Sequence, residues 1–144
     1  MALVQVIVAM AMILLCGVAG VRALVEMNRK AAAMRTLNNA RAVVQRNIDT
    51  ALGVPFSRTA APAVLAITPA AGVIYDEDGN GDGLVDVVTP RSGVGAVVQG
   101  TLLRTVLAEP GSEGADVRRV SFQLTYTYRA KPYTYQMSTL RAQD

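Results

Sequence analysis

The first 52 residues of this chain contain no proline, and their hydrophobic pattern changes only once, near residue 21. From Met1 to Val21 the sequence is apolar, and Gln5 is its one polar interruption. At about 1.5 Å per residue such a run spans about 30 Å, the thickness of the hydrocarbon core of a bilayer. An amphipathic segment continues to about Leu52. We therefore predict one helix over residues 1–52, of which residues 1–21 form a transmembrane segment.

The apolar run could be a cleaved secretory signal, a lipoprotein signal or a membrane anchor. A cleaved secretory signal begins with a basic region, but the first four residues contain no lysine or arginine. A lipoprotein signal needs a small residue before its cysteine, whereas Leu15 precedes Cys16. The sequence favours the third interpretation, a membrane anchor whose helical continuation is used for packing.

An apolar stripe runs through the amphipathic half of the predicted helix. Its members recur mostly at three- and four-residue steps, which places them along one side of a helix: Leu24, Met27, Ala31, Met34, Leu37, Val44, Ile48 and Leu52. We expect the carboxyl-terminal half of the stripe to contact the globular part of the same chain. The half nearer the membrane has no evident partner within the chain.

The composition argues against an enzyme. The chain has no histidine and a single cysteine, which removes imidazole bases, thiol–imidazole pairs and the common zinc ligand sets. Residues 22–50 carry six cations and two carboxylates, a net charge of +4, and the rest of the chain has a net charge of −1. Because this basic charge lies on a helix next to an apolar run, with few aromatic residues, we predict no nucleic-acid partner.

Residues 53–144 are predicted to form a small globular domain. Gly53 and Pro55 are placed to end the helix. Six runs then have strand-like composition: 63–68, 72–75, 84–88, 96–107, 117–129 and 132–140. The last two form the clearest pair, joined across Arg129 to Pro132. The predicted fold class is α+β, a long amino-terminal helix packed on an antiparallel sheet of about four to six strands.

An acidic, glycine-rich loop lies between Tyr75 and Val87. Oxygen-bearing side chains at alternating positions, with glycines that permit a sharp wrap, suit a calcium ion; the candidate ligands are Asp76, Asp78, Asn80, Asp82 and Asp86. Counted from Asp78, the twelfth position is Thr89 where an EF-hand has glutamate, so an EF-hand proper is excluded. The alternative is a hairpin turn held by hydrogen bonds between side chains and backbone.

The opening sequence, MALVQVIVAMAMI over residues 1–13, resembles the mature amino terminus of type IV pilins and type II secretion pseudopilins. The resemblance covers residues 1–52, and a strand pair that ends in Ser-Thr-Leu-Arg is also similar to minor pilins. It implies that a prepilin peptidase removes a leader, that the new terminal amine is methylated, and that the helices pack into a filament core. The implied assembly residues are Met1, Gln5, Ala9 and Ile13.

Gln5 departs from the family, which usually has glutamate at this position. The resemblance implies that this glutamate neutralises the terminal amine of a neighbouring subunit inside an apolar core, where an unpaired charge is costly. An amide can accept a hydrogen bond from that amine but cannot cancel its charge. Because a tip subunit has no preceding neighbour to neutralise, Gln5 favours a minor or tip position. The alternative is a main subunit in a filament that tolerates a neutral partner.

The resemblance implies a structural function. The chain is expected to be a subunit of a pilus-like filament, first held in the bacterial inner membrane and then assembled with other pilin-like subunits by an inner-membrane platform. A type II secretion pseudopilin, with a short periplasmic filament in place of an extracellular pilus, remains an alternative. So does a membrane-anchored calcium-binding or adhesive module that never polymerises.

Overall fold

The computed structural model describes residues 2–57, 61–77, 79, 81–88, 97–110 and 116–143. Its elements are helix α1 (Ala2–Gly53), the 3₁₀-helix η1 (Ala63–Leu65) and five strands: β1 (Val73–Ile74), β2 (Val85–Val88), β3 (Val98–Glu109), β4 (Val117–Tyr128) and β5 (Lys131–Ala142). The chain divides into two compact units, Met1–Arg35 and Thr36–Asp144. The α+β class and the long amino-terminal helix are as predicted.

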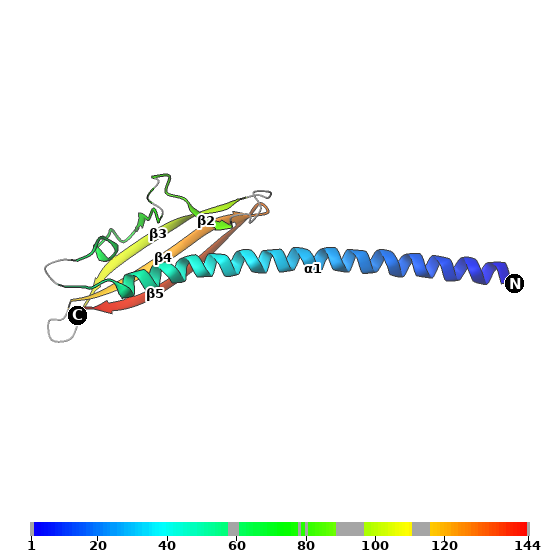
Figure 1. Ribbon diagram of the computed structural model, residues 1–144, viewed down its shortest axis with the longest axis horizontal. Coiled ribbons are helices and arrows are strands. Elements are labelled where there is room, and N and C mark those ends of the chain that lie inside the picture. Colours follow the sequence, from blue (N-terminus) through cyan, green and yellow to red (C-terminus); the bar gives the residue numbers. More distant parts are fainter. Residues whose placement is uncertain are drawn as a thin grey trace. The chain divides into compact units, whose positions relative to one another are not determined.

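All strand pairs of the second unit are antiparallel, and the sheet order is β1-β3-β4-β5, with β2 also paired to β3 (Figure 1). Strands β3, β4 and β5 are each 12 residues long and form the body of the sheet. A two-residue turn, Arg129 and Ala130, joins β4 to β5, and both residues have positive φ angles of 51° and 59°. Turns of this conformation match the twist of paired strands, which explains the short connection.

Side chains alternate between the two faces of the sheet. On one face, apolar residues of β3 and β4 are fully buried, among them Leu102, Val106, Val120, Phe122 and Leu124. The opposite face is mostly polar, although Leu107 and Leu140 are exposed on it. Rows of aligned hydroxyl side chains cross the strands on this face; one row is Thr101, Thr125 and Thr134, and another is Thr105, Ser121 and Ser138. This period of two gives the sheet one face for a core and one for water.

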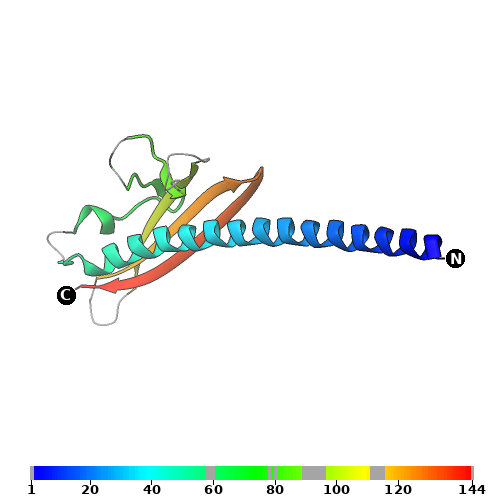
Figure 2. The same cartoon turned by 45° about the vertical axis from the view of Figure 1, so that its right-hand side comes forward.

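The last third of α1 belongs to the second unit and covers the apolar face of the sheet. Ala40, Val44, Ile48 and Ala51 are at most 4% exposed and join the core cluster of the sheet. Figures 1 and 2 both show this part of the helix lying along β4 and β5. The carboxyl-terminal part of the predicted stripe thus packs on the chain's own sheet at Val44 and Ile48, whereas Leu52 remains 42% exposed.

The run 63–68, predicted as a strand, is not one. Its first residues form η1, and Thr68 alone pairs with β3, through a bond from its amide to the Val106 carbonyl (3.0 Å) and one from the Val106 amide to its hydroxyl (2.9 Å). Long-range contacts fix this path. Arg104 donates to the Ala63 carbonyl and Arg118 to the Leu65 carbonyl, so both carbonyls point toward guanidinium groups and not toward a neighbouring strand.

Candidate functional site

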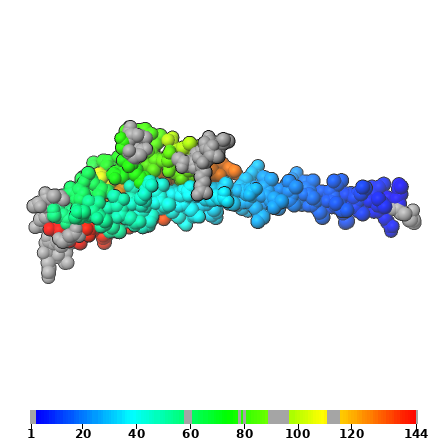
Figure 3. All heavy atoms as spheres, viewed as in Figure 1, coloured from blue at the N-terminus to red at the C-terminus, as the bar shows by residue number. Residues whose placement is uncertain are grey.

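The first unit is a single helix whose apolar side chains face outward. Every described side chain from residue 3 to residue 31 is exposed, and Figure 3 shows this stretch in blue with its side chains on the surface. Sixteen large apolar side chains between Leu3 and Met34 are more than 40% exposed. Covering them is worth on the order of 30 kcal/mol, at about 2 kcal/mol each. This surface therefore requires lipid or protein around it.

This unit contains the part of the chain that can cross a membrane. Among the described residues one helix, α1, is long and apolar enough by length and composition. No residue of its most apolar 18-residue window is buried inside the chain. Charged residues begin only at Arg22, so the apolar length matches the bilayer thickness expected from the sequence.

The candidate assembly residues lie along one side of this helix. Gln5, Ala9 and Ile13 follow at four-residue intervals, so their side chains are neighbours on the helix surface. All three are exposed, Ile13 to 71%. Met1 lies outside the described residues. The helix thus presents an amide, a small side chain and a large apolar side chain on the same face.

Charge is sparse and exposed on the rest of the first unit. Lys30 and Glu26 form an ion pair with a Nζ–Oε1 distance of 3.0 Å, and both side chains are more than 65% exposed. A pair of this kind, at an i,i+4 spacing in water, contributes only about 0.3–0.5 kcal/mol. The pair adds two charged side chains to the surface of residues 22–35. It contributes little to the stability of the helix beyond the apolar run.

The acidic loop of the second unit is organised by Asp76. Its two carboxylate oxygens accept hydrogen bonds from the backbone amides of Gly79 (3.0 Å) and Gly81 (2.5 Å). Gly79, Gly81 and Gly83 all have positive φ angles, a conformation that other residues rarely adopt. Counting a calcium loop from Asp76 places Gly81 at the sixth position, where such loops need glycine. Counted from Asp78, the sixth position is Gly83, which also has a positive φ angle, so the backbone conformation fits either count.

The other described acidic side chains of the loop also have donors. The Asp82 carboxylate accepts from the Leu84 amide at 2.7 Å, and the Asp86 carboxylate accepts from the Gln99 side chain at 3.2 Å. Asp78 and Asn80 lie outside the described residues. Among the residues that are described, no three acidic, histidine or cysteine side chains gather as metal ligands. The described part has side-chain to backbone hydrogen bonds of the predicted kind, but the loop is not a hairpin, because β1 and β2 both pair with β3 and not with each other. A carboxylate oxygen with one donor can still bind a cation.

Sequence reasoning missed the role of Glu77. Its Oε1 lies 2.5 Å from an Arg46 nitrogen, and its side chain is only 17% exposed. This ion pair ties the acidic loop to the helix that covers the sheet. Glu77 lies outside the alternating pattern of candidate ligands. The one sequence signal for its role was Arg46, a charged residue on the part of the helix that packs on the sheet. The loop is therefore anchored by an internal contact.

Comparison of the chain with protein-family models, with curated proteins and with solved structures found no match. The two candidate sites of the chain differ in kind. The exposed helix of the first unit is a large apolar surface that needs a partner, whereas the acidic loop is a small, internally bonded turn on the second unit.

Proposed function

We propose that this chain is a structural subunit of a pilin-like filament, assembled by packing of its amino-terminal helices. One observation carries the proposal: the first unit is a helix that is apolar over the thickness of a bilayer, and the large apolar side chains of that stretch are exposed. The resemblance of residues 1–13 to mature pilins supports the same function. The second unit is the part that such a subunit displays to water.

In the proposed mechanism, the apolar surface of the helix leaves lipid and is covered by the helices of neighbouring subunits. Lipid covers residues 1–21 before assembly, and the helices of neighbouring subunits cover residues 1 to about 25 afterwards. Because lipid tails are as apolar as leucine, helix contacts inside the membrane depend on close van der Waals packing. Beyond the apolar run, exposed side chains such as Leu24 leave water when neighbours cover them, which favours the assembled state. The partners are other pilin-like subunits and an inner-membrane assembly platform.

Gln5 bears on the position of the subunit in the filament. An amide near a neighbour's terminal amine can accept one hydrogen bond but leaves the positive charge uncompensated, at a cost of several kcal/mol in an apolar core. A minor or tip position reduces the number of such contacts. The alternative is a main subunit in a filament that tolerates a neutral side chain at this position.

Shearing tests the proposed function. A tagged chain, expressed in a host that has a pilus or secretion assembly platform, should appear in the sheared filament fraction as well as in membranes. The matched control is the same host with its assembly ATPase inactivated, in which the chain should remain in membranes only. Equal recovery from both hosts would show that the chain does not polymerise, and would favour the membrane-anchored module.

We propose in addition that calcium binds weakly at the acidic loop and stabilises the second unit. With a dissociation constant of about 1 mM, a concentration of about 10 mM calcium raises the free energy of unfolding by about 1.4 kcal/mol. The measurement is thermal unfolding of the full chain in detergent, with calcium, magnesium or sodium chloride at matched ionic strength. Only calcium is expected to raise the unfolding midpoint clearly.

Asp82→Asn provides the matched variant for this calcium prediction. Asparagine retains an oxygen that can accept from the Leu84 amide, so the turn keeps its hydrogen bond while one charge is removed. The variant should respond to calcium much less than the parent chain. An unchanged calcium response in Asp82→Asn, or a parent chain indifferent to calcium, would leave a loop held only by its own hydrogen bonds as the correct interpretation.

A further inference from the structure

The first unit carries a basic segment directly after its apolar run. Residues 22–35 contain four cations and one carboxylate, a net charge of +3, and the cations are Arg22, Arg29, Lys30 and Arg35. All four cationic side chains are exposed. Three of them are arginines, whose planar guanidinium groups match the oxygens of a phosphate better than the ammonium group of lysine does. The segment is therefore suited to bind phosphate groups at the end of the membrane-spanning run.

Two of the arginines lie on the same face of the helix. Arg22 and Arg29 are seven residues apart, which is close to two turns. Glu26 lies between them on this face, but its carboxylate pairs with the Lys30 ammonium at a Nζ–Oε1 distance of 3.0 Å. Within the part of the chain that the structure describes, neither arginine forms an ion pair with a carboxylate. This face thus presents two guanidinium groups whose charge the chain itself does not neutralise.

Both arginines are within reach of the headgroup layer of a bilayer. Arg22 follows the apolar run directly, and Arg29 lies eight residues beyond Val21, which is about 12 Å along the helix axis. The headgroup layer on each side of the hydrocarbon core is about 5–8 Å thick. Helical side chains tilt toward the amino terminus, so a long arginine side chain extends back toward the membrane. Both guanidinium groups therefore reach the lipid phosphates when residues 1–21 span a bilayer.

We propose that Arg22 and Arg29 form a binding site for the phosphate of an anionic lipid headgroup. The inference rests on the insertion of residues 1–21 into lipid, which is the first step of the proposed function, and not on polymerisation. Each guanidinium can donate two parallel hydrogen bonds to phosphate oxygens. A bilayer holds many phosphates at a fixed level beside the two arginines, which favours the lipid over a phosphate ion in solution. The contact holds the unassembled subunit among anionic lipids.

Arg35 lies outside the proposed site and provides the matched control. It is 14 residues beyond Val21, about 21 Å along the helix axis, and is turned about 140° away from Arg22. It therefore lies beyond the headgroup layer and on a different face. Replacement of Arg35 by glutamine removes the same charge as replacement of Arg22. A comparison of the two variants separates a local contact from a general effect of net charge.

Quenching of a single tryptophan by brominated lipid tests the site. The chain contains no tryptophan, so Val18→Trp adds one fluorescent reporter. Val18 is 52% exposed and lies four residues before Arg22, one turn deeper on the same face. The full chain is reconstituted in phosphatidylcholine vesicles in which one lipid has brominated acyl chains. That lipid is phosphatidylglycerol in one series and phosphatidylcholine in the other, and the ratio of quenching gives the relative association constant.

The expected preference for phosphatidylglycerol is about fivefold for each arginine, or about 25-fold for the reporter chain. Arg22→Gln or Arg29→Gln should reduce the preference to about fivefold, and the double variant should remove it. Arg35→Gln should leave it unchanged. An increase in ionic strength from about 0.1 to about 1 M should weaken the preference, because the Debye length falls from about 10 to about 3 Å. Inorganic phosphate should displace no more lipid than chloride does at the same ionic strength.

The outcomes separate this inference from the proposed function. Equal quenching by the two brominated lipids overturns the site and leaves the filament function in place. An equal loss of preference in Arg22→Gln and Arg35→Gln also overturns it, because net charge alone would then explain the result. Displacement by inorganic phosphate beyond that by chloride overturns the lipid as the ligand. Absence of quenching by either lipid shows that residue 18 is outside the hydrocarbon, which overturns both the site and the membrane step of the proposed function.

Discussion

Replacement of Ile13 by aspartate should remove the chain from filaments almost completely. Ile13 is 71% exposed on the apolar helix and has only lipid or another helix to contact. Among the packed helices of a filament a carboxylate would be buried without a partner charge, at a cost of about 3–5 kcal/mol, which corresponds to a loss of incorporation of more than about 100-fold. Ala9→Asp, on the same helix face, should act in the same direction. The measurement is the ratio of chain in sheared filaments to chain in membranes.

Two controls accompany the Ile13 prediction. Ile13→Val keeps the side chain apolar and β-branched and should assemble normally, and the membrane pool of Ile13→Asp shows whether the variant still inserts. The second unit should remain folded, because no described side chain among residues 3–35 belongs to its core cluster. Normal incorporation of an inserted Ile13→Asp chain would contradict the role of the helix in assembly.

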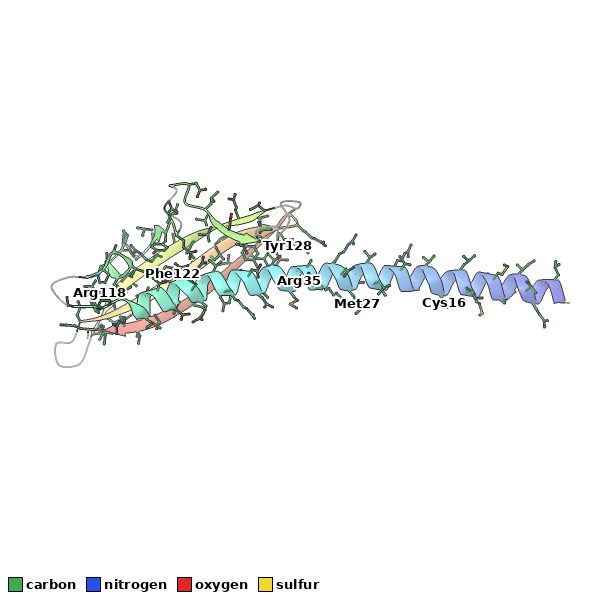
Figure 4. All side chains as sticks on the ribbon, viewed as in Figure 1. Cys16, Met27, Arg35, Arg118, Phe122 and Tyr128 are labelled. Carbon is green, nitrogen blue, oxygen red and sulfur yellow. The ribbon has the colours of Figure 1, made fainter. Side chains whose placement is uncertain are left out.

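Arg118→Ala should lower the free energy of unfolding of the second unit by about 3 kcal/mol. The Arg118 side chain is 8% exposed, donates to the Leu65 carbonyl at 2.6 Å, pairs with Asp116 at 3.0 Å and lies 4.6 Å from the centre of the Phe56 ring. Its removal leaves a buried carbonyl and a partly buried carboxylate without their donor. Figure 4 shows Arg118 on the same sheet as Phe122, a fully buried core residue.

Arg119 supplies the matched control for this prediction. It is the next residue of β4, its side chain is 52% exposed, and it pairs with Glu109 at 2.8 Å. An exposed ion pair contributes at most about 1 kcal/mol, so Arg119→Ala should change the free energy of unfolding little. The measurement is chemical denaturation of the full chain in detergent, followed by near-ultraviolet circular dichroism of the tyrosines. Equal losses for the two variants would show that Arg118 has no special role.

The sequence predicts the helix and the main strands well because their signals are local. The absence of proline up to Pro55, with Gly53 before it, places the helix end at Leu52, one residue from the observed end at Gly53. Alternation of apolar and polar residues locates β4 and β5 nearly to their ends. These patterns depend only on residues close together in the chain.

The features that the sequence did not predict depend on distant residues. The run 63–68 is rich in apolar residues like a strand, but donors from Arg104 and Arg118, about 40 and 50 residues away, fix its carbonyls in another path. The ion pair between Arg46 and Glu77 is likewise invisible to local patterns. For the long helix, the sequence predicted that the carboxyl-terminal half of the apolar stripe contacts the globular part, and the structure confirms this at the buried Val44 and Ile48, whereas Leu24 and Met27 are exposed.

The most direct test of the filament function is quantitative mass spectrometry of sheared surface filaments beside the membrane fraction, including the amino-terminal peptide. We predict a peptide that begins with methylated Met1 and is present in the filaments. Abundance comparable to a main subunit would place the chain as a main subunit despite Gln5, and trace abundance would agree with the minor or tip position that Gln5 suggests. An unmethylated chain that is confined to membranes and absent from filaments would contradict the proposed function.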